Sequence, residues 1–304
     1  MAKQSEWRGY LLVMLAAACW ACAGTLAKYM MNQAIPALVL VEMRVTIAAG
    51  ILLAGFWLKN PRFLKIKPSD VPYLSILGVV GVAGVHYSYY YAISKTNVAT
   101  AILLQYLAPA LILLFAVVVQ GEPFSLHKLL SLLCAFAGCF LVIGGYDRNL
   151  FATNKNGVMA GLIAAGFFAF YSLYAERGLR RYPIWTMLFY GFTAAALFWW
   201  CIYPPWKILA AHYSLKIWFV FFVLGVFSAI VPFGCYFAGM RAIGATRASI
   251  TAMLEPVIAG VVAYLFLGET MTALQVMGGV LVLGGIGLLQ VTRKPLKRND
   301  KDYT

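Results

Sequence analysis

The sequence predicts an all-α integral membrane protein with ten transmembrane helices arranged as two inverted five-helix repeats. Three observations lead to this fold class. Of the 304 residues, 63% are hydrophobic and only 11% are charged, a composition that a water-soluble domain could not bury. Apolar runs of about 18 residues or more, long enough to cross a bilayer as helices, fill most of the chain. Finally, the two halves of the chain match one another at a constant displacement.

The apolar runs are separated by short polar segments that leave no room for a further domain. They cover residues 10–31, 37–57, 71–94, 98–119, 126–145, 157–175, 184–203, 215–238, 245–267 and 273–292. Each run is continuously apolar and lacks the alternation of a membrane β-barrel strand, so each is expected to be a helix. The first run is longer than the apolar core of a signal peptide, and we interpret it as a retained helix.

The distribution of Lys and Arg predicts that both termini lie in the cytoplasm and that the protein resides in the cytoplasmic (inner) membrane. With the amino terminus inside, seventeen of the 24 basic residues fall on the cytoplasmic side and five on the other, in agreement with the positive-inside rule. The net charge of +14 is therefore attributed to topology, and no nucleic-acid partner is expected. The six cysteines lie within or beside apolar runs and are interpreted as packing residues.

The internal repeat is clearest in two segments of the same length. Residues 107–122 read LAPALILLFAVVVQGE and residues 254–269 read LEPVIAGVVAYLFLGE, a displacement of 147 without a gap. Because this displacement spans five helices, the second copy is inserted in the opposite direction. We expect a first repeat at 1–147, a second at 148–292 and a basic cytoplasmic tail at 293–304. Inverted repeats are typical of secondary transporters, whose sites lie near the membrane midplane.

The segment 236–285 carries Glu255, Pro256, Gly268 and Glu269. With Trp20, Lys28 and Arg44 in the first half, it resembles the EamA type of the drug/metabolite transporter superfamily. The resemblance implies two five-helix domains around a central cavity, peripheral fifth and tenth helices, and export or uptake of small metabolites, often amino acids. Ala108 departs from the family pattern, because a Glu is expected before Pro109. The two halves are therefore not chemically equivalent.

Ionisable side chains inside membrane spans are costly and commonly functional. Five stand out: Lys28, Glu42, Arg44, His86 and Glu255. Glu255 is expected near the midplane, directly before Pro256, and two interpretations stay open. It is either a site for a coupling proton or a substrate amine, or a carboxyl that caps backbone groups freed by the proline.

Arg44 and Lys28 also allow two interpretations each. Arg44 binds a substrate carboxylate, or it holds the bundle together by pairing with Glu42 or another helix. Lys28 takes part in coupling or gating, or its ammonium group snorkels toward the membrane surface. Pro109 and Pro256, at matching positions, are either hinges for alternating access or static kinks.

Aromatic residues form the last group of candidates. The run HYSYYY occupies residues 86–91. Its Tyr87, Tyr90 and Tyr91 fall on one side of a helix, and we expect them either to line a substrate cavity with Trp20 and Tyr106 or to form an interfacial belt. The candidate substrate-binding residues, beside Glu255, are Trp20, His86, Tyr87, Tyr90 and Tyr106.

The predicted function is secondary active transport of amino acids or related small metabolites, most readily as export, by alternating access through a central cavity. The alternative is a transporter of choline-like or other organic cations, with an aromatic cage and Glu255 as counter-charge. Expected partners are a small-molecule substrate, the lipid bilayer and a proton gradient, with a monomer and a homodimer both open. No cofactor or metal is expected, no GxxxxGK[ST] motif for a built-in ATPase occurs, and an enzyme is disfavoured.

Overall fold

The computed structural model describes residues 2–147, 154–267 and 270–291, and within these ranges it contains helices and turns but no strands. In the described part of the chain, ten helical segments are long and apolar enough to cross a membrane, as predicted. The first five spans comprise α1 (Ala2–Asn32), α2 (Ala37–Lys59), α3 (Val71–Ile76) continued by η3 (Leu77–Ala83) and α4 (Gly84–Lys95), α5 (Val98–Gln105) followed by α6 (Ala108–Val118), and α7 (Leu126–Ile143).

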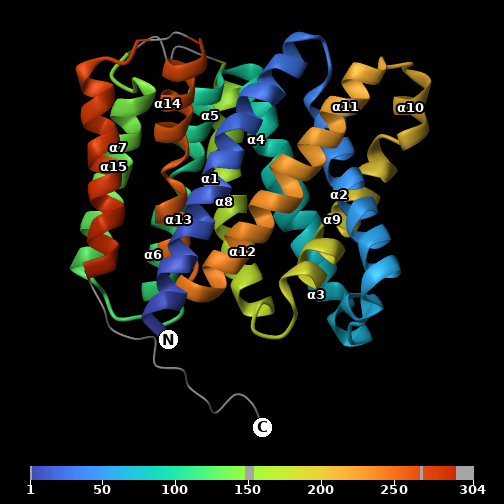
Figure 1. Ribbon diagram of the computed structural model, residues 1–304, viewed down its shortest axis with the longest axis horizontal. Coiled ribbons are helices and arrows are strands. Elements are labelled where there is room, and N and C mark those ends of the chain that lie inside the picture. The colour runs from blue at the N-terminus through green and yellow to red at the C-terminus, as the bar shows by residue number, and fades with distance from the viewer. Residues whose placement is uncertain (1, 148–153, 268–269, 292–304) are drawn as a thin grey trace.

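The second five spans repeat this order. They comprise α8 (Lys155–Gly178), α9 (Ile184–Ile202), α11 (Leu215–Leu224) continued by η5 (Gly225–Ile230) and α12 (Val231–Ile243), α13 (Ala245–Ala252) followed by α14 (Glu255–Leu267), and α15 (Ala273–Val291). A short helix, α10 (Pro205–Ala210), lies between the second and third of these spans. In Figure 1, α1 starts at the end of the bundle where the amino terminus is marked, whereas α8 starts at the opposite end. The two repeats are therefore inverted.

Two helix breaks occupy equivalent places in the repeats. Helix α5 ends at Gln105 and α13 at Ala252, while α6 begins at Ala108 and α14 at Glu255, so both breaks keep the displacement of 147 residues. Proline has no amide hydrogen, and its ring clashes with the carbonyl four residues earlier. Because Pro109 and Pro256 follow the breaks directly, the expected kinks are complete interruptions of the helix.

The third span of each repeat contains a π-helical segment at the same place. The segments are η3 (Leu77–Ala83) and η5 (Gly225–Ile230), and the helices that continue them start at Gly84 and Val231. A π-helical turn inserts one residue into an α-helix and leaves backbone groups with altered partners. Both repeats thus carry two irregular spans, the third and the fourth.

The fifth and tenth spans, α7 and α15, lie side by side at one edge of the bundle (Figure 1). Their backbones approach closely because both helices carry glycine at the contact: a Cβ atom built on Gly138 would lie 2.6 Å from the Gly278 carbonyl oxygen. This small-residue contact is typical of membrane helices. The peripheral position agrees with the one that the family resemblance implies for these two helices.

The loop between α2 and α3 belongs to the first repeat and forms hydrogen bonds with the second repeat at the amino-terminal face of the bundle. The Tyr182 hydroxyl donates to Asp70 Oδ2 at 2.6 Å, and the Tyr190 hydroxyl donates to the Leu64 carbonyl at 2.7 Å. Both tyrosines belong to the second repeat and both acceptors to the first. An open hollow of about 610 Å³ beside this loop is lined by Lys65, Lys67 and Arg181, among other residues, and it shares no residue with the helix breaks.

Candidate functional site

A small cavity lies where the helix breaks of the two repeats meet. Its polar wall consists of Arg44, His86, Tyr89, Tyr90, Gln105, Tyr106 and Glu255, and its larger apolar side chains are Trp20, Val85, Ile102, Phe168 and Phe233. The volume is about 50 Å³, well below the roughly 300–1,000 Å³ of sites that hold small molecules. A metabolite would enter this cavity only if its walls moved apart.

Glu255 and Tyr106 join the two breaks directly. Tyr106 lies in the first break, between α5 and α6, and Glu255 is the first residue of α14, after the second break. The Tyr106 hydroxyl lies 2.8 Å from Glu255 Oε2 and 2.7 Å from the Ala252 carbonyl oxygen. It can donate a hydrogen bond to either oxygen. Glu255 is 8% exposed, so its carboxyl faces the protein interior rather than the lipid chains.

The Ala252 carbonyl is available to Tyr106 because of Pro256. In a regular helix the Ala252 oxygen would accept from the amide of residue 256, which in this chain is a proline without an amide hydrogen. A buried carbonyl without a donor is costly. The Tyr106 hydroxyl supplies that donor from the other repeat, so the break in one repeat is stabilised by a side chain in the break of the other.

Arg44 makes a similar connection from α2. Its side chain, in a residue only 4% exposed, donates through Nη1 to the Tyr90 hydroxyl at 3.0 Å and through Nη2 to the Ser228 carbonyl. Ser228 lies in the π-helical segment η5, and the residue four positions later is Pro232, which cannot give the Ser228 carbonyl an α-helical hydrogen bond. The sequence left open whether Arg44 pairs with Glu42 or with another helix. In the structure Arg44 bonds to groups on other helices, and in the described residues it forms no ion pair with Glu42.

Three side chains in the wall, those of His86, Arg44 and Tyr89, carry polar atoms without a hydrogen-bond partner in the described residues; for Tyr89 this atom is the hydroxyl oxygen. Neither ring nitrogen of His86 nor Arg44 Nε has a hydrogen-bond partner within the described residues. His86 is 2% exposed, and its ring packs edge-on against Phe233 at 5.2 Å between centroids. Leaving buried donors or acceptors unpaired costs about 1–3 kcal/mol per group. A ligand that bonds to these nitrogens would recover that cost.

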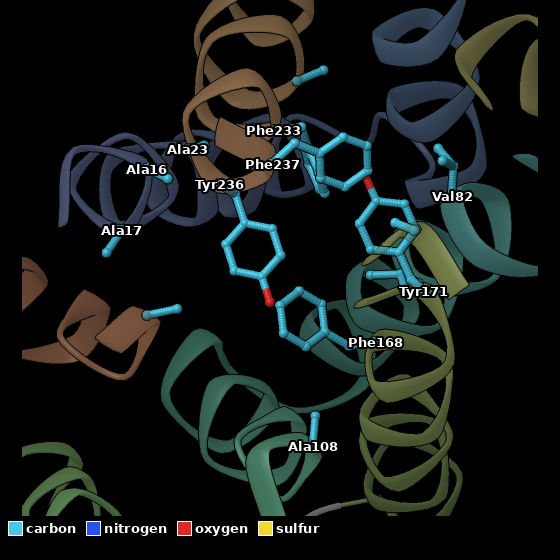
Figure 2. Close-up of a cluster of buried hydrophobic side chains, with 14 of the residues drawn as sticks. Ala16, Ala17, Ala23, Val82, Ala108, Phe168, Tyr171, Phe233, Tyr236 and Phe237 are labelled. Carbon is cyan, nitrogen blue, oxygen red and sulfur yellow. The ribbon is translucent and has the colours of Figure 1, made fainter. Parts of the chain in front are cut away.

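An aromatic cluster from both repeats packs beside the cavity, with Trp20 from the first repeat and the other rings from the second. Trp20 packs against Phe233 at 5.1 Å and against Tyr236 at 5.4 Å, and Phe168 packs against Tyr236 at 5.7 Å between ring centroids. Figure 2 shows the hydroxyl end of Tyr236 next to the Phe168 ring, within the same cluster as Phe233 and Phe237. The edge-to-face and tilted arrangements of these rings are favourable, and they present apolar surface to any ligand in the cavity.

Four candidate residues occupy places outside the cavity wall. Tyr87 packs against Trp199 at 5.0 Å and against Tyr91 at 5.9 Å between ring centroids. Lys28 donates to the Ile93 carbonyl at 3.0 Å and so ties α1 to the end of α4. Pro109 and Pro256 lie in the first turns of α6 and α14, where they shape the breaks.

Sequence reasoning missed three residues of this site. Tyr89 lines the cavity with His86 and Tyr90, and the spacing i, i+3, i+4 places these three on one helical face. Pro232, whose effect on the Ser228 carbonyl is described above, was detectable as a proline within an apolar run. Gln105 was detectable because it lies four residues before Pro109, which frees its carbonyl.

Glu42, another ionisable residue of the predicted spans, is fully buried outside the wall, with no hydrogen-bond partner for either carboxyl oxygen in the described residues.

Ten spans in two inverted repeats, with a polar cavity between them, define a multi-pass membrane transporter. The sequence model of the EamA-like transporter family matches residues 7–144 and again residues 155–291. The chain belongs to this family, and each of its two repeats carries one copy of the family's domain.

Relatives of similar length support the same class. The chain is 26% identical to the uncharacterized inner membrane transporter YicL of Salmonella typhimurium, with 93% of this chain and 95% of that protein covered. It is 26% identical to the pseudopaline exporter CntI of Pseudomonas aeruginosa, with 94% and 97% covered. One solved structure, 20% identical, matches with a TM-score of 0.74 over 95% of this chain and 96% of the other, which supports the fold.

Proposed function

We propose that the protein is a secondary active transporter that exports amino acids or related zwitterionic metabolites by alternating access. The observation that carries this proposal is the presence of Arg44 and Glu255 in the wall of one cavity. Arg44 comes from the first repeat and Glu255 from the second. A substrate held by both would span the interface between the repeats, where alternating access requires the site to lie.

The chemistry of the wall matches the two ends of an amino acid. Arginine binds carboxylates through paired hydrogen bonds, and Arg44 keeps Nε without a protein partner in the described residues. Glu255 offers a counter-charge for an ammonium group, and Trp20, Phe168 and Phe233 offer apolar surface for a side chain. The buried positive charge of Arg44 argues against the alternative of a choline-like cation, because like charges repel strongly in a poorly solvated site.

Export is proposed because one full-length relative is named an exporter of pseudopaline. Alternating access is supported by the size of the cavity, which is too small for a metabolite in this arrangement, and by the cross-repeat hydrogen bonds that close it. The location proposed for the chain is the cytoplasmic membrane with both termini inside, in keeping with the distribution of basic residues.

Proton coupling through Glu255 is supported by the hydrogen bonds of Tyr106. A tyrosine hydroxyl has a single proton to donate, yet two acceptors lie within 2.8 Å of it. Both contacts are satisfied together when the Glu255 carboxyl carries a proton and donates it to the Tyr106 oxygen, which in turn donates to Ala252. Loss of that proton would break this chain of hydrogen bonds between the repeats.

A ligand panel tests the substrate class. Purified protein is melted in the presence of a neutral amino acid, the matching amine without the carboxylate, the matching acid without the ammonium, and choline. A ligand that binds the folded state raises the melting temperature. We expect amino acids to stabilise the protein most, and the best ligand to exchange across proteoliposome membranes. Stabilisation by choline and the lone amine, with none by amino acids, would replace this proposal with the cation carrier.

A further inference from the structure

Three prolines near the cavity each remove the helical donor of a carbonyl four residues earlier. Pro232 frees the Ser228 carbonyl and Pro256 frees the Ala252 carbonyl. These two accept from Arg44 and Tyr106 respectively. Pro109 does the same to the Gln105 carbonyl, and among the backbone hydrogen bonds of turns, loops and helix ends in the described residues none ends on that oxygen. Of the three freed carbonyls, that of Gln105 thus has no donor from outside its own helix in the part of the chain that the structure describes.

The Gln105 carbonyl has no donor from the other repeat because the two repeats differ in sequence at the break. Gln105 and Ala252 are equivalent under the displacement of 147 residues, and both end the helix before a break. Ala252 receives its donor from Tyr106 in the other repeat. The residue equivalent to Tyr106 is Met253, whose thioether has no hydrogen to donate. The second repeat therefore cannot return the hydrogen bond that the first repeat gives.

Gln105 lies in the wall of the cavity together with Glu255. We propose that the Gln105 carbonyl and the Glu255 carboxyl bind the substrate ammonium group together. A carbonyl oxygen accepts only from a group with a hydrogen on nitrogen, so this site selects substrates with a primary or secondary ammonium over quaternary ones. The inference rests on the proposed function and adds to it the feature that recognises the amine end of the substrate.

The first test uses the unmodified protein and a methylation series. The affinity of the best amino acid from the ligand panel is compared with that of its N-methyl and N,N,N-trimethyl derivatives. We expect the trimethyl derivative to bind at least about tenfold more weakly, since a hydrogen bond to a charged group contributes about 1.4 kcal/mol or more. Equal affinity across the series would overturn the inference and leave the proposed function standing, whereas no binding of any amino acid would overturn the proposed function itself.

The second test supplies the missing helical donor. The Pro109→Ala substitution provides an amide hydrogen four residues after Gln105 and so occupies its carbonyl, without changing a side chain of the cavity wall. We expect this variant to lose most of its preference for the unmethylated amino acid. Pro123→Ala, in the exposed loop after α6, is the matched control and should keep that preference. An unchanged preference in Pro109→Ala, in protein that melts as sharply as the control, would contradict the inference.

Discussion

Tyr106 and Glu255 lie on different repeats, and 2.8 Å separates the tyrosine oxygen from the carboxyl oxygen Oε2. Each residue belongs to a helix break that a proline imposes on its own repeat. The contact therefore connects the two places where the membrane-spanning backbone is interrupted. If the two repeats move apart during transport, this hydrogen bond must break, and it must form again when they return.

The Tyr106→Phe substitution should loosen that connection while keeping the aromatic ring. It removes the donor to the Ala252 carbonyl, and a buried acceptor left unpaired costs about 1–3 kcal/mol. We expect a clear fall in the melting temperature of the purified protein. Tyr264→Phe, at a tyrosine of α14 that is 55% exposed, serves as the control and should melt like the unmodified protein. Equal melting of both variants would show that the Tyr106 hydroxyl does not hold the breaks together.

Arg44→Lys should weaken the binding of carboxylate ligands. Arg44 already donates to Tyr90 and to the Ser228 carbonyl. A lysine ammonium with the same two partners keeps at most one donor, whereas the guanidinium keeps enough for paired hydrogen bonds to a carboxylate. We expect about tenfold weaker binding of amino acids and little change for the matching amines without a carboxylate, measured by calorimetry. A uniform loss for both ligand classes would instead indicate a purely structural role for Arg44.

His86→Leu separates binding from stability. The imidazole nitrogens have no hydrogen-bond partner within the described residues, so an apolar replacement removes unpaired polar atoms and should leave the melting temperature unchanged or raise it. Substrate binding should fall by roughly tenfold if the nitrogens face the ligand. His127→Leu, at an exposed histidine of α7, should change neither quantity. A destabilised His86→Leu with normal affinity would contradict the assignment.

Gly138→Ala tests the peripheral pairing of α7 and α15. The added methyl group would meet the Gly278 carbonyl oxygen at 2.6 Å and the Val282 nitrogen at 2.8 Å, and backbone atoms cannot yield as a side chain can. Overpacking of this kind costs about 1–3 kcal/mol, so the melting temperature should fall. Gly284→Ala, where no atom lies within 4 Å, should have no such effect.

Hydrophobicity and the internal repeat were sufficient to predict the ten spans and their division into two copies, because a bilayer permits little else. Proline positions also predicted the irregularities near residues 106 and 253. The face of the third span was harder to predict. Tyr87 was expected in the cavity, yet Tyr89 occupies the wall and Tyr87 packs against Trp199. A helical wheel gives the angles between side chains on one helix, but not which face meets the other repeat.

The connections of Arg44 could not be predicted for a related reason. Its partners, Tyr90 and Ser228, are separated from it by 46 and 184 residues respectively, and such distant contacts depend on how the helices pack. Pro232 indicated that a carbonyl would be free, but not which side chain would reach it. Local chemistry can therefore be derived from the sequence, whereas the pairing of groups across the interface of the repeats requires the fold.

Proton coupling through Glu255 is measured in proteoliposomes loaded with the best ligand of the panel. A pH gradient is imposed, and flux is compared between the unmodified protein and Glu255→Gln, which keeps a hydrogen-bonding side chain for Tyr106 but cannot ionise. We predict that the gradient drives net transport in the unmodified protein, and that the variant remains folded but shows no response to pH. Equal pH-driven transport by both proteins would show that Glu255 does not couple a proton to transport.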